Sequence, residues 1–566
     1  MQQTCQHCHQ PFEIDAVDQD FYKRMGVPPP TFCWRCRMQR RMAFRNERKL
    51  YPSTCTKTDK PIITIFDPAS HYVVYDRDTW WQDDWSALEF GQNYDWNTPF
   101  FTQWRELFKR VPHPAVFNNK CTNSAYCNHV GDMNNCYLVF ATWTAENVSY
   151  SHQVQRCRDS FDISAGSESE LVYEIIGGDR LYNVQFAQDC AQVRNSQLLY
   201  DCRNVHDCFG CTNLRNKSFC LFNEQLDEAT YRQKVAALDT GSYTQLQSLK
   251  QQLADLKLKA LHRFAHTIDS AGSTGENIVG VSNSQYIFDG KKDIADCRYL
   301  ANALQLTDSR DGYGIGAHAD QLYEGVDFGV DGSHLAFGVV VWGGRDVFYS
   351  YNCNNCTDCF GCIGLRNAHY CILNKQYTKE EYEQLLPKII QQMNDQPYVD
   401  TKGRIYRYGE FFPTELSPFA YNETVAQEHF PLTQSEVMAE GWRWKVDDTT
   451  DKTYTIIAEQ LPDHIKDTND DITQQVIQCL HKGQCNQQCT QVYKLLPKEF
   501  EYLQTRNIAL PRLCSNCRHF ERLAQKLPNN LWPGHCSRCS APFMTPYAPD
   551  RPETIYCAQC YQAEVT

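Results

Sequence analysis

The stretch Cys208-Phe209-Gly210-Cys211-Thr212-Asn213-Leu214-Arg215-Asn216 returns, with two substitutions, as Cys359-Phe360-Gly361-Cys362-Ile363-Gly364-Leu365-Arg366-Asn367. The same offset of 151 residues matches Cys202 to Cys353, Cys220 to Cys371 and Tyr231 to Tyr382. A gapless match of this length predicts two copies of one domain in the centre of the chain.

Short polar-then-aromatic units fill both copies. Examples are Asn135-Cys136-Tyr137-Leu138 and Arg180-Leu181-Tyr182 in the first copy, and Cys297-Arg298-Tyr299 in the second. Short strands separated by Asn, Asp and Gly favour a β-solenoid with two strands per turn, and an antiparallel sandwich is the alternative. The predicted fold class is therefore mainly β with small α+β zinc ribbons. A duplicated β-solenoid core is flanked by treble-clef or zinc-ribbon-like modules at both termini.

Cysteine pairs at both ends have the spacing of metal knuckles. Cys5-x2-Cys8 and Cys33-x2-Cys36 predict a zinc site with four thiolate ligands. An offset of 481 residues matches Cys8, Cys33 and Cys36 to Cys489, Cys514 and Cys517, which predicts a second copy of this site. Its fourth ligand is predicted as Cys485, for which Cys479 or His481 can substitute. A third site is predicted from Cys536, Cys539, Cys557 and Cys560.

The N-terminal counterpart of this third site has lost most of its ligands. The corresponding residues are Cys55, Thr58, Asp76 and Thr79, so residues 53–79 are expected to keep the ribbon fold without metal. We therefore expect about three Zn2+ ions per chain. A site closed by four thiolates has no open coordination position, which indicates a structural role, with redox sensing as the alternative.

Basic residues surround the first site. Nine basic side chains stand against one acidic one between Phe21 and Leu50. Residues 37–49 contain neither Pro nor Gly and are predicted to form a helix with a row of guanidiniums on one face. Such a face suits a phosphate backbone, and the alternative is that it docks on the acidic remainder of this chain or faces solvent. The candidate nucleic-acid-binding residues are Arg35, Arg37, Arg40, Arg41, Arg45, Arg48 and Lys49.

The motifs divide the chain into nine segments. The predicted boundaries are a zinc ribbon with an Arg-rich helix (1–52), a metal-free ribbon and linker (53–115), the first solenoid lobe (116–224), a helical connector (225–270), the second lobe (271–376), a capping helix (377–395), an extended linker (396–470) and two zinc ribbons (471–530 and 531–566). Leucines between residues 246 and 256 recur at helical spacing. They are expected to pack on the lobe, and a homodimer through a coiled coil is the alternative.

Two further sets of residues are candidates for catalysis or metal binding. The second lobe carries Asp308, Asp311, Asp320, Glu324, Asp327 and Asp331, which stacked turns can bring together as a carbohydrate-hydrolase carboxylate pair. Acidic residues at turns are more often solvated corners. The central Cys-x2-Cys pairs, 208/211 and 359/362, are expected to be buried packing thiols rather than metal ligands.

The chain also resembles a known but uncharacterised family. Residues 5–36, with Phe12-Glu13-Ile14 and Asp20-Phe21-Tyr22, are similar to the bacterial "probable zinc-ribbon" domain family. The wider chain resembles multi-zinc-ribbon proteins of uncultured ultra-small bacteria. This wider resemblance rests on the following residues: Ala43-Phe44-Arg45-Asn46-Glu47-Arg48-Lys49-Leu50-Tyr51, the two repeated stretches, Tyr421-Asn422-Glu423-Thr424-Val425-Ala426-Gln427 and Tyr547-Ala548-Pro549-Asp550-Arg551-Pro552-Glu553. The resemblance implies zinc binding and no particular activity. Some relatives carry the CoA-transferase label CaiB/BaiF.

Composition bounds the remaining choices. The 566 residues are 42% hydrophobic and 22% charged, which is typical of globular proteins. There is neither an apolar run of membrane-spanning length nor a signal-peptide pattern, so we expect a cytoplasmic protein without a membrane partner. In a reducing compartment the 29 cysteines favour metal ligation and burial over disulfides. The net charge of −13 argues against a protein that coats nucleic acid over its whole surface.

The sequence therefore predicts a zinc-binding scaffold, more consistent with a binding protein than with an enzyme. The expected partner is RNA or the ribosome, bound through the N-terminal Arg-rich module. The alternatives are a carbohydrate-active hydrolase and a protein-binding adaptor whose acidic lobes contact protein partners.

Overall fold

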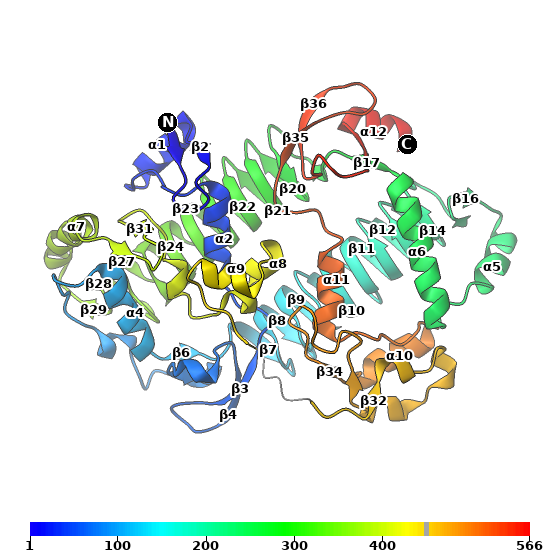
Figure 1. Cartoon of the computed structure of the whole chain (residues 1–566), viewed down its shortest axis with the longest axis horizontal. Helices are drawn as coiled ribbons and strands as arrows, with labels where there is room; N and C mark the ends of the chain where they lie inside the picture. Colours follow the sequence, from blue (N-terminus) through cyan, green and yellow to red (C-terminus); the bar gives the residue numbers. More distant parts are fainter. Residues whose placement is uncertain (447–451, 566) are drawn as a thin grey trace.

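The computed structural model describes residues 1–446 and 452–565. It is mainly β, and most of its strands belong to two large stacks of parallel strands (Figure 1). We name them the first stack (β7–β16) and the second stack (β18–β29). Small hairpin-and-helix modules at both ends of the chain carry cysteine clusters and lie against the stacks.

The first stack is almost entirely parallel. Its strands are β7 (Asn118–Thr122), β8 (Asn128–Asn134), β9 (Phe140–Ser149), β10 (Gln155–Ser167), β11 (Tyr173–Gln188), β12 (Ala191–Tyr200), β13 (Arg203–His206), β14 (Phe209–Thr212), β15 (Cys220–Leu221) and β16 (Glu224–Gln225). Trp143 of β9 lies opposite Gln155 of β10, and Phe161 of β10 lies opposite Tyr173 of β11. Paired residues are thus 12 positions apart, as in the side-chain bond from Asn147 to Asp159.

A period of three residues explains this register. Asp132, Asn135 and Leu138 all have left-handed backbone conformations, with φ of 53°, 53° and 52°, and the pattern continues at almost every third residue of the stack. Each left-handed residue bends the chain, so one residue of every three points inward. The inward positions are filled mostly by small apolar residues such as Val130 and Cys136, at most 2% exposed. Left-handed backbone costs a non-glycine residue roughly 1–2 kcal/mol, and Asn and Asp tolerate it best.

Serines at inward positions are hydrogen-bonded along the stack. The hydroxyl of Ser160 accepts from the amide of Val172, and that of Ser196 accepts from the amide of Cys208, each at 3.1 Å. Both bonds join residues 12 positions apart. The narrow interior therefore accommodates small polar groups without leaving them unpaired.

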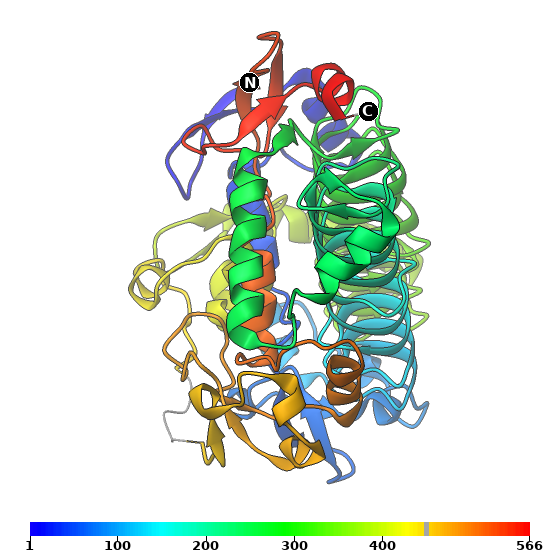
Figure 2. The same ribbon diagram turned by 90° about the vertical axis from the view of Figure 1, so that its right-hand side faces the viewer.

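The second stack has the same construction with local insertions. Its strands are β18 (Thr267–Ile268), β19 (Gly275–Glu276), β20 (Ile278–Ser282), β21 (Gln285–Ala295), β22 (Arg298–Thr307), β23 (Arg310–Gly329), β24 (Ser333–Trp342), β25 (Arg345–Phe348), β26 (Tyr351–Asn354), β27 (Thr357–Phe360), β28 (His369–Ile372) and β29 (Lys375–Gln376). The register shifts within β21 and β23. Gly316 lies at such a shift with φ of +120°, and a Cβ there would lie 1.9 Å from the carbonyl oxygen of Leu304. Figure 2 shows the ladder of parallel strands from the side.

Each terminal module packs on the stack that is farther from it in the sequence. The N-terminal segment packs on the second stack, which is distant in sequence, and the C-terminal segment packs mainly on the first. The N-terminal elements are β1 (Gln2–Thr4), β2 (Pro11–Glu13), α1 (Ala16–Arg24), α2 (Trp34–Met42), β3 (Tyr51–Thr54), β4 (Pro61–Thr64), η1 (Pro68–Ser70), β5 (Val74–Tyr75), α3 (Arg77–Trp80), η2 (Ala87–Phe90), α4 (Phe100–Arg110) and β6 (His113–Pro114). The C-terminal elements are β33 (Ile477–Gln478), β34 (Val492–Tyr493), α10 (Pro497–Thr505), α11 (Ser515–Leu523), β35 (Trp532–His535), β36 (Pro542–Thr545), β37 (Thr554–Tyr556) and α12 (Ala558–Val565).

Helices follow each stack, as the sequence pattern indicates. They are α5 (Glu228–Ala236) and α6 (Tyr243–Lys259) after the first stack, and α7 (Lys379–Asp395) after the second. Leu246 and Leu249 of α6 are buried in the cluster that contains Phe186 and Leu198 of the first stack. These leucines therefore pack on the stack. After α6, β17 (Leu261–Arg263) pairs with β37 near the C-terminus.

The segment 396–470 differs from the extended linker that we expected. It folds into β30 (Tyr398–Val399), β31 (Ile405–Tyr406), η3 (Thr414–Leu416), η4 (Tyr421–Glu423), α8 (Val425–His429), α9 (Gln434–Ala439), β32 (Ile456–Ile457), η5 (Ala458–Gln460), η6 (Ile465–Asp467) and, running past its end, η7 (Asp470–Gln474). Phe411 and Phe412 are fully buried and contact Phe44 of the N-terminal module. The linker prediction missed this segment because its apolar residues show no helical or strand periodicity. Residues 447–451 of the predicted linker lie outside the described residues.

Candidate metal centres and the clamp they anchor

The four cysteines predicted for the first site lie together. The sulfur atoms of Cys5, Cys8, Cys33 and Cys36 are all within 4.8 Å of one another, and those of Cys8 and Cys33 are 3.8 Å apart. A tetrahedron of zinc–sulfur bonds of about 2.3 Å has edges of about 3.8 Å, so this set of donors fits a tetrahedral metal ion. The amide of Cys33 donates to the sulfur of Cys5 at 3.3 Å, which favours the thiolate form of that ligand.

The second cluster corrects one predicted ligand. It contains Cys479, Cys489, Cys514 and Cys517, so Cys479 takes the place that we assigned to Cys485. Two of its edges, Cys479 to Cys517 and Cys489 to Cys514, measure 3.9 Å. The amide of Cys514 donates to the sulfur of Cys479 at 3.3 Å, just as the amide of Cys33 donates to Cys5 in the first cluster. Cys479 is therefore the structural equivalent of Cys5, although it lies seven residues upstream of the matching sequence position.

The third cluster joins Cys536, Cys539, Cys557 and Cys560 as predicted by spacing. The sulfur atoms of Cys539 and Cys557 are 3.8 Å apart. Burial raises the pKa of Cys536, but hydrogen bonds from the backbone amides of Cys557, Cys539 and Arg538 outweigh burial and lower that pKa to about 6. A thiol with this pKa is largely ionised near neutral pH, which suits a metal ligand.

The ribbon of residues 53–79 has hydrogen bonds at the corresponding positions. The amide of Asp76 donates to the sulfur of Cys55 at 3.2 Å. The carboxylate of Asp76 in turn accepts from the amides of Asp78 and Thr79 and caps α3. Asp76 thus starts its helix with a side-chain cap at the position where Cys33 and Cys514 start α2 and α11.

The predicted basic helix is shorter than expected, and its arginines are not exposed. Helix α2 spans Trp34–Met42 rather than residues 37–49, so Arg45 and Arg48 lie beyond its end. The chain leaves the helix because residues 43–50 pack between other segments, where the Asn46 side chain donates to the carbonyl of Ile65. The five arginines Arg37, Arg40, Arg41, Arg45 and Arg48 are each at most 5% exposed. These guanidiniums therefore do not form an exposed row, which agrees with the alternative that they dock on acidic residues of this chain.

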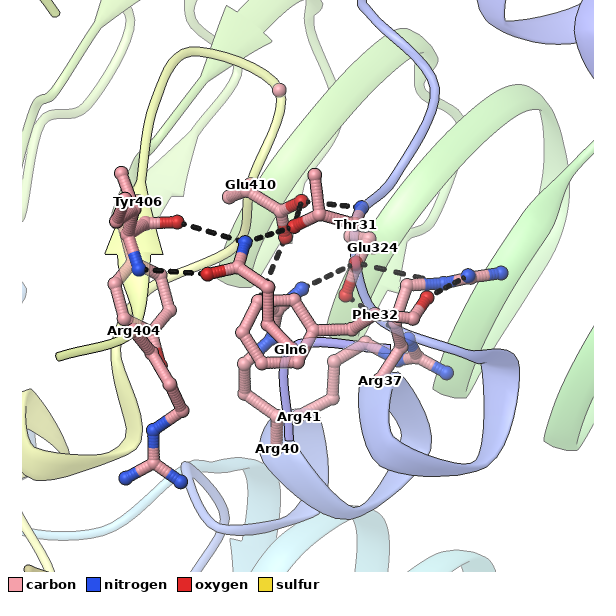
Figure 3. Close-up of polar contacts among 12 residues, drawn as sticks. Gln6, Thr31, Phe32, Arg37, Arg40, Arg41, Glu324, Arg404, Tyr406 and Glu410 are labelled. Atoms are coloured by element: carbon pink, nitrogen blue, oxygen red, sulfur yellow. Dashed lines mark hydrogen bonds and ion pairs between the residues drawn. The ribbon is translucent and has the colours of Figure 1, made fainter. Parts of the chain in front are cut away.

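Three of these arginines meet carboxylates of β23 in the second stack (Figure 3). Arg37 contacts Asp311 at 2.8 Å, and Arg41 contacts Glu324 at 3.0 Å. Arg40 lies between Glu324 at 2.8 Å and Glu410 at 2.9 Å. Burial alone would lower the pKa of Arg37, but Asp311 holds it well above its ordinary value, so the guanidinium stays charged.

The C-terminal module makes the matching contacts with the first stack. Arg518 and Arg522 of α11 each contact Asp162 of β10 at 2.7 Å, and Arg518 also contacts Glu499 at 2.7 Å. All four side chains are at most 9% exposed. Arg518 and Arg522 stand at an offset of 481 residues from Arg37 and Arg41. The two ends of the chain thus use equivalent arginines on opposite stacks.

A side chain directly after the fourth cluster position touches a stack in every ribbon. Arg37 follows Cys36, Arg518 follows Cys517, and Tyr561 follows Cys560. The hydroxyl of Tyr561 contacts Asp201 and accepts from Arg215 at 3.0 Å. Trp80 follows Thr79 in the ribbon that lacks three cysteines, and its ring lies 5.4 Å from the guanidinium of Arg366. We name the clamp the set of contacts that Arg37, Trp80, Arg518 and Tyr561 make with the stacks. It also includes the contacts of Arg40 and Arg41 of α2 and of Arg522 of α11.

The two end modules meet in the interior. Arg48 lies 2.9 Å from Nδ1 of His519, and Nε2 of His519 lies 3.2 Å from Glu428. Glu47 joins this group through Nε2 of His152, at 2.8 Å. Burial lowers the pKa of Arg48 to about 10 and holds that of His519 well below its usual range. A buried network of charged side chains and the neutral imidazole of His519 therefore connects the modules to each other.

Arg35 and Lys49 complete the predicted basic set. Arg35 is exposed and lies over the ring of Phe430 at 5.5 Å. Lys49 is half-buried and lines a cavity near the second cluster. The structure therefore separates these two residues from the buried arginines.

The predicted acidic candidates of the second lobe are mostly engaged by the modules. Asp311 and Glu324 belong to the clamp, Asp308 pairs with Arg24, and Asp327 contacts His129 and Arg45. Asp320 and Asp331 are exposed. The buried carboxylates are thus partners of arginines rather than a pair that faces a groove.

The central cysteine pairs are buried thiols. Cys208, Cys211, Cys359 and Cys362 are fully buried at inward positions of the stacks. Burial raises the pKa of both Cys208 and Cys211 to about 12, which keeps them protonated. The groups of metal-binding geometry found among the described residues do not include them.

Residues outside the predicted sites complete the clamp. Glu410 accepts from the amide of Thr31 at 2.7 Å as well as from Arg40, and Gln6 contacts the backbone of Ile405 (Figure 3). In the sequence, the segment 396–470 is marked only by the family-like stretch Tyr421–Gln427, and no local pattern indicates its contacts with the N-terminal module.

Comparisons with known proteins leave the family open. No protein-family model and no curated protein matches the chain. A crystal structure of a "putative acetyltransferase" from Desulfovibrio desulfuricans G20 aligns with 8% identity over 52% of this chain and 76% of that chain, at a TM-score of 0.10. At this TM-score the likeness carries no argument about fold or function. Among the helices of the described residues, none is both long and apolar enough to cross a membrane.

Proposed function

We propose that this protein is a non-enzymatic scaffold in which zinc-bound modules at both ends hold two β-solenoid lobes together. One observation carries the proposal. Cys33 and Cys514, each a member of a cysteine tetrad, are the N-cap residues of α2 and α11, the helices whose arginines make buried ion pairs with the stacks. The residues that would hold metal therefore also position the clamp.

The proposed mechanism runs from ligand to helix to stack. Cys33 and Cys36 lie at the start of α2, so fixing their sulfur atoms fixes the direction of the helix. Arg37, Arg40 and Arg41 then reach the carboxylates of Asp311 and Glu324 in the second stack. A bound zinc ion would supply the cross-link that small modules with little core need in order to fold.

We further propose that both stacks are β-solenoids. The 12-residue register and the left-handed residue at every third position support this view. Each turn then has four short sides rather than the two strands that we expected. A stiff coil of this kind is a suitable frame for presenting a surface to partners.

The alternatives fit less well. Arginines at most 5% exposed are not placed to neutralise phosphates, which disfavours RNA binding through them. Asp311 and Glu324 are paired with arginines, which disfavours the carbohydrate hydrolase. A protein partner with a basic surface agrees best with the net charge of −13.

Metal analysis of single-site variants tests the proposal. Cys8→Ser, Cys489→Ser and Cys539→Ser should each lower the zinc content of the purified full chain by about one ion. Cys121→Ser is the matched control, since Cys121 belongs to none of the metal-binding groups found among the described residues. A wild-type chain without bound zinc, or three variants with unchanged zinc content, would refute the proposal.

A further inference from the structure

Two more potential ligands lie against the second tetrad. His481 and Cys485 form a group with Cys517 in which all ligand atoms lie within 4.8 Å of one another. The sulfur atoms of Cys485 and Cys517 are 3.8 Å apart, the spacing that also separates Cys8 from Cys33. Cys517 therefore belongs to two groups of metal-binding geometry at once.

The extra ligands are absent from the N-terminal copy. At the offset of 481 residues, Cys485 corresponds to Thr4 and Asn486 corresponds to Cys5. Cys479 already completes the tetrad in place of Cys5, so His481 and Cys485 are not needed for it. The loop that carries them is an addition to this module.

His481 has an unsatisfied group at this place. Its Nδ1 atom is buried and has no hydrogen-bond partner in the part of the chain that the structure describes. A buried polar atom without a partner costs about 1–3 kcal/mol. Nδ1 is one of the two imidazole atoms that bind metal ions, so a metal ion at this group would remove that cost.

A cavity adjoins the group. It has a volume of about 250 Å³, and Cys485 forms part of its wall together with Glu423, Lys445, Asn486 and Gln488. This wall is rich in amide and charged groups. A metal ion bound to Cys485 would thus lie beside a polar space large enough for water or a small ligand.

We propose that His481, Cys485 and Cys517 bind an additional Zn2+ ion, which shares the Cys517 thiolate with the zinc of the second tetrad. Five thiolates and two Zn2+ ions carry a formal charge of about −1, against about −2 for four thiolates and one ion. Three protein ligands leave one coordination position for water or a small anion from the cavity, the arrangement found in reactive rather than closed zinc sites. This inference rests on the proposal that the tetrads hold zinc.

Zinc counting by native mass spectrometry of the full chain tests the inference. The wild-type chain should contain four zinc ions, and His481→Ala and Cys485→Ser should each contain three. Cys121→Ser should keep four. With Co2+ in place of zinc, added azide should change the visible spectrum of the wild-type chain and leave that of Cys485→Ser unchanged, because only the additional site has an exchangeable position.

The outcomes separate this inference from the scaffold proposal. Three zinc ions in the wild-type chain, whether Cys485→Ser keeps all three or loses one, would overturn the additional site and leave the three tetrads in place. If Cys485→Ser loses one of these three ions, Cys485 would be a ligand of the second zinc site itself. A wild-type chain without zinc would overturn both proposals.

Discussion

Asp162 is the carboxylate on which the C-terminal half of the clamp depends. Each of its oxygens is 2.7 Å from a guanidinium, that of Arg522 on one side and that of Arg518 on the other, and all three side chains are buried. Removing one partner of a buried ion pair leaves an uncompensated charge and typically costs 3–5 kcal/mol. We expect Asp162→Asn to lower the free energy of unfolding by about that amount, measured by urea denaturation.

Glu168 provides the matched control in the same stack. It pairs with Arg156, and both side chains are more than 40% exposed. An exposed pair contributes at most about 1 kcal/mol. Glu168→Gln should therefore change the unfolding free energy little. Equal effects of the two substitutions would show that the Asp162 contacts do not stabilise the fold.

His113 should give the stability a dependence on pH. Burial lowers its pKa to about 4, and its Nε2 donates to the carbonyl of Phe108 at 2.8 Å. The unfolded chain, with a His pKa of about 6.5, binds a proton in the range where the folded chain does not. The free energy of unfolding should therefore fall by roughly 3 kcal/mol as the pH drops from about 6.5 to about 4.

Comparison with His113→Phe isolates this effect, because the variant keeps an aromatic ring against Phe108. Acid also releases metal from thiolates, but that contribution is common to both proteins and cancels in the difference. As the pH falls, the unfolding free energy of the variant should decrease less steeply than that of the wild type. The difference in slope should correspond to about one bound proton. Parallel curves would mean that His113 is not the neutral buried group described above.

The helices α2 and α11 show what local sequence signals predict. The knuckle spacing correctly placed Cys33 and Cys36 together, and Cys33 begins the helix. The end of α2 at Met42 was missed because residues 43–49 lack Pro and Gly, and only packing against distant segments stops the helix. The Cys479 ligand was also missed as first choice, since its position depends on the path of a loop rather than on spacing.

The stacks show a second limit of sequence reasoning. The 151-residue offset predicts two copies, and the polar-then-aromatic units predict short strands, but neither pattern indicates the three-residue period. Inward positions such as Val130, Met133 and Cys136 follow that period. The aromatic units recur less regularly along the sequence. In the sequence, this period is visible as small apolar residues at every third position.

The inward cysteines lead to a prediction for thiol chemistry. Burial raises the pKa of Cys127 to about 12 and that of Cys157 to about 11, so neither forms a reactive thiolate near neutral pH. In the native chain these thiols should resist alkylation both before and after zinc is removed. The cysteines of the tetrads should react only after removal.

Alkylation read out by peptide mass spectrometry checks this prediction. Cys121, which is half-buried at the edge of the first stack, should react slowly in both states and serves as an internal reference. Rapid labelling of Cys127 or Cys157 in the native chain would contradict the buried placement.

The contacts of the two terminal modules connect the two stacks to each other. The N-terminal module holds the second stack, the C-terminal module holds the first, and Arg48 meets His519 where the modules join. The sequence offsets predict both the duplication of the modules and that of the lobes. They do not indicate which stack each module contacts, because the partners Arg37 and Asp311 are more than 270 positions apart and no local pattern relates them.

If zinc-bound modules hold the stacks together, zinc must support the clamp. Hydrogen–deuterium exchange of the full chain, before and after complete zinc removal by a chelator, measures this. We expect the amides of α2 (Trp34–Met42) and α11 (Ser515–Leu523) to lose protection after removal, while those of β12 in the middle of the first stack stay protected. Unchanged protection of α2 and α11 in a chain shown to be free of zinc would contradict the account.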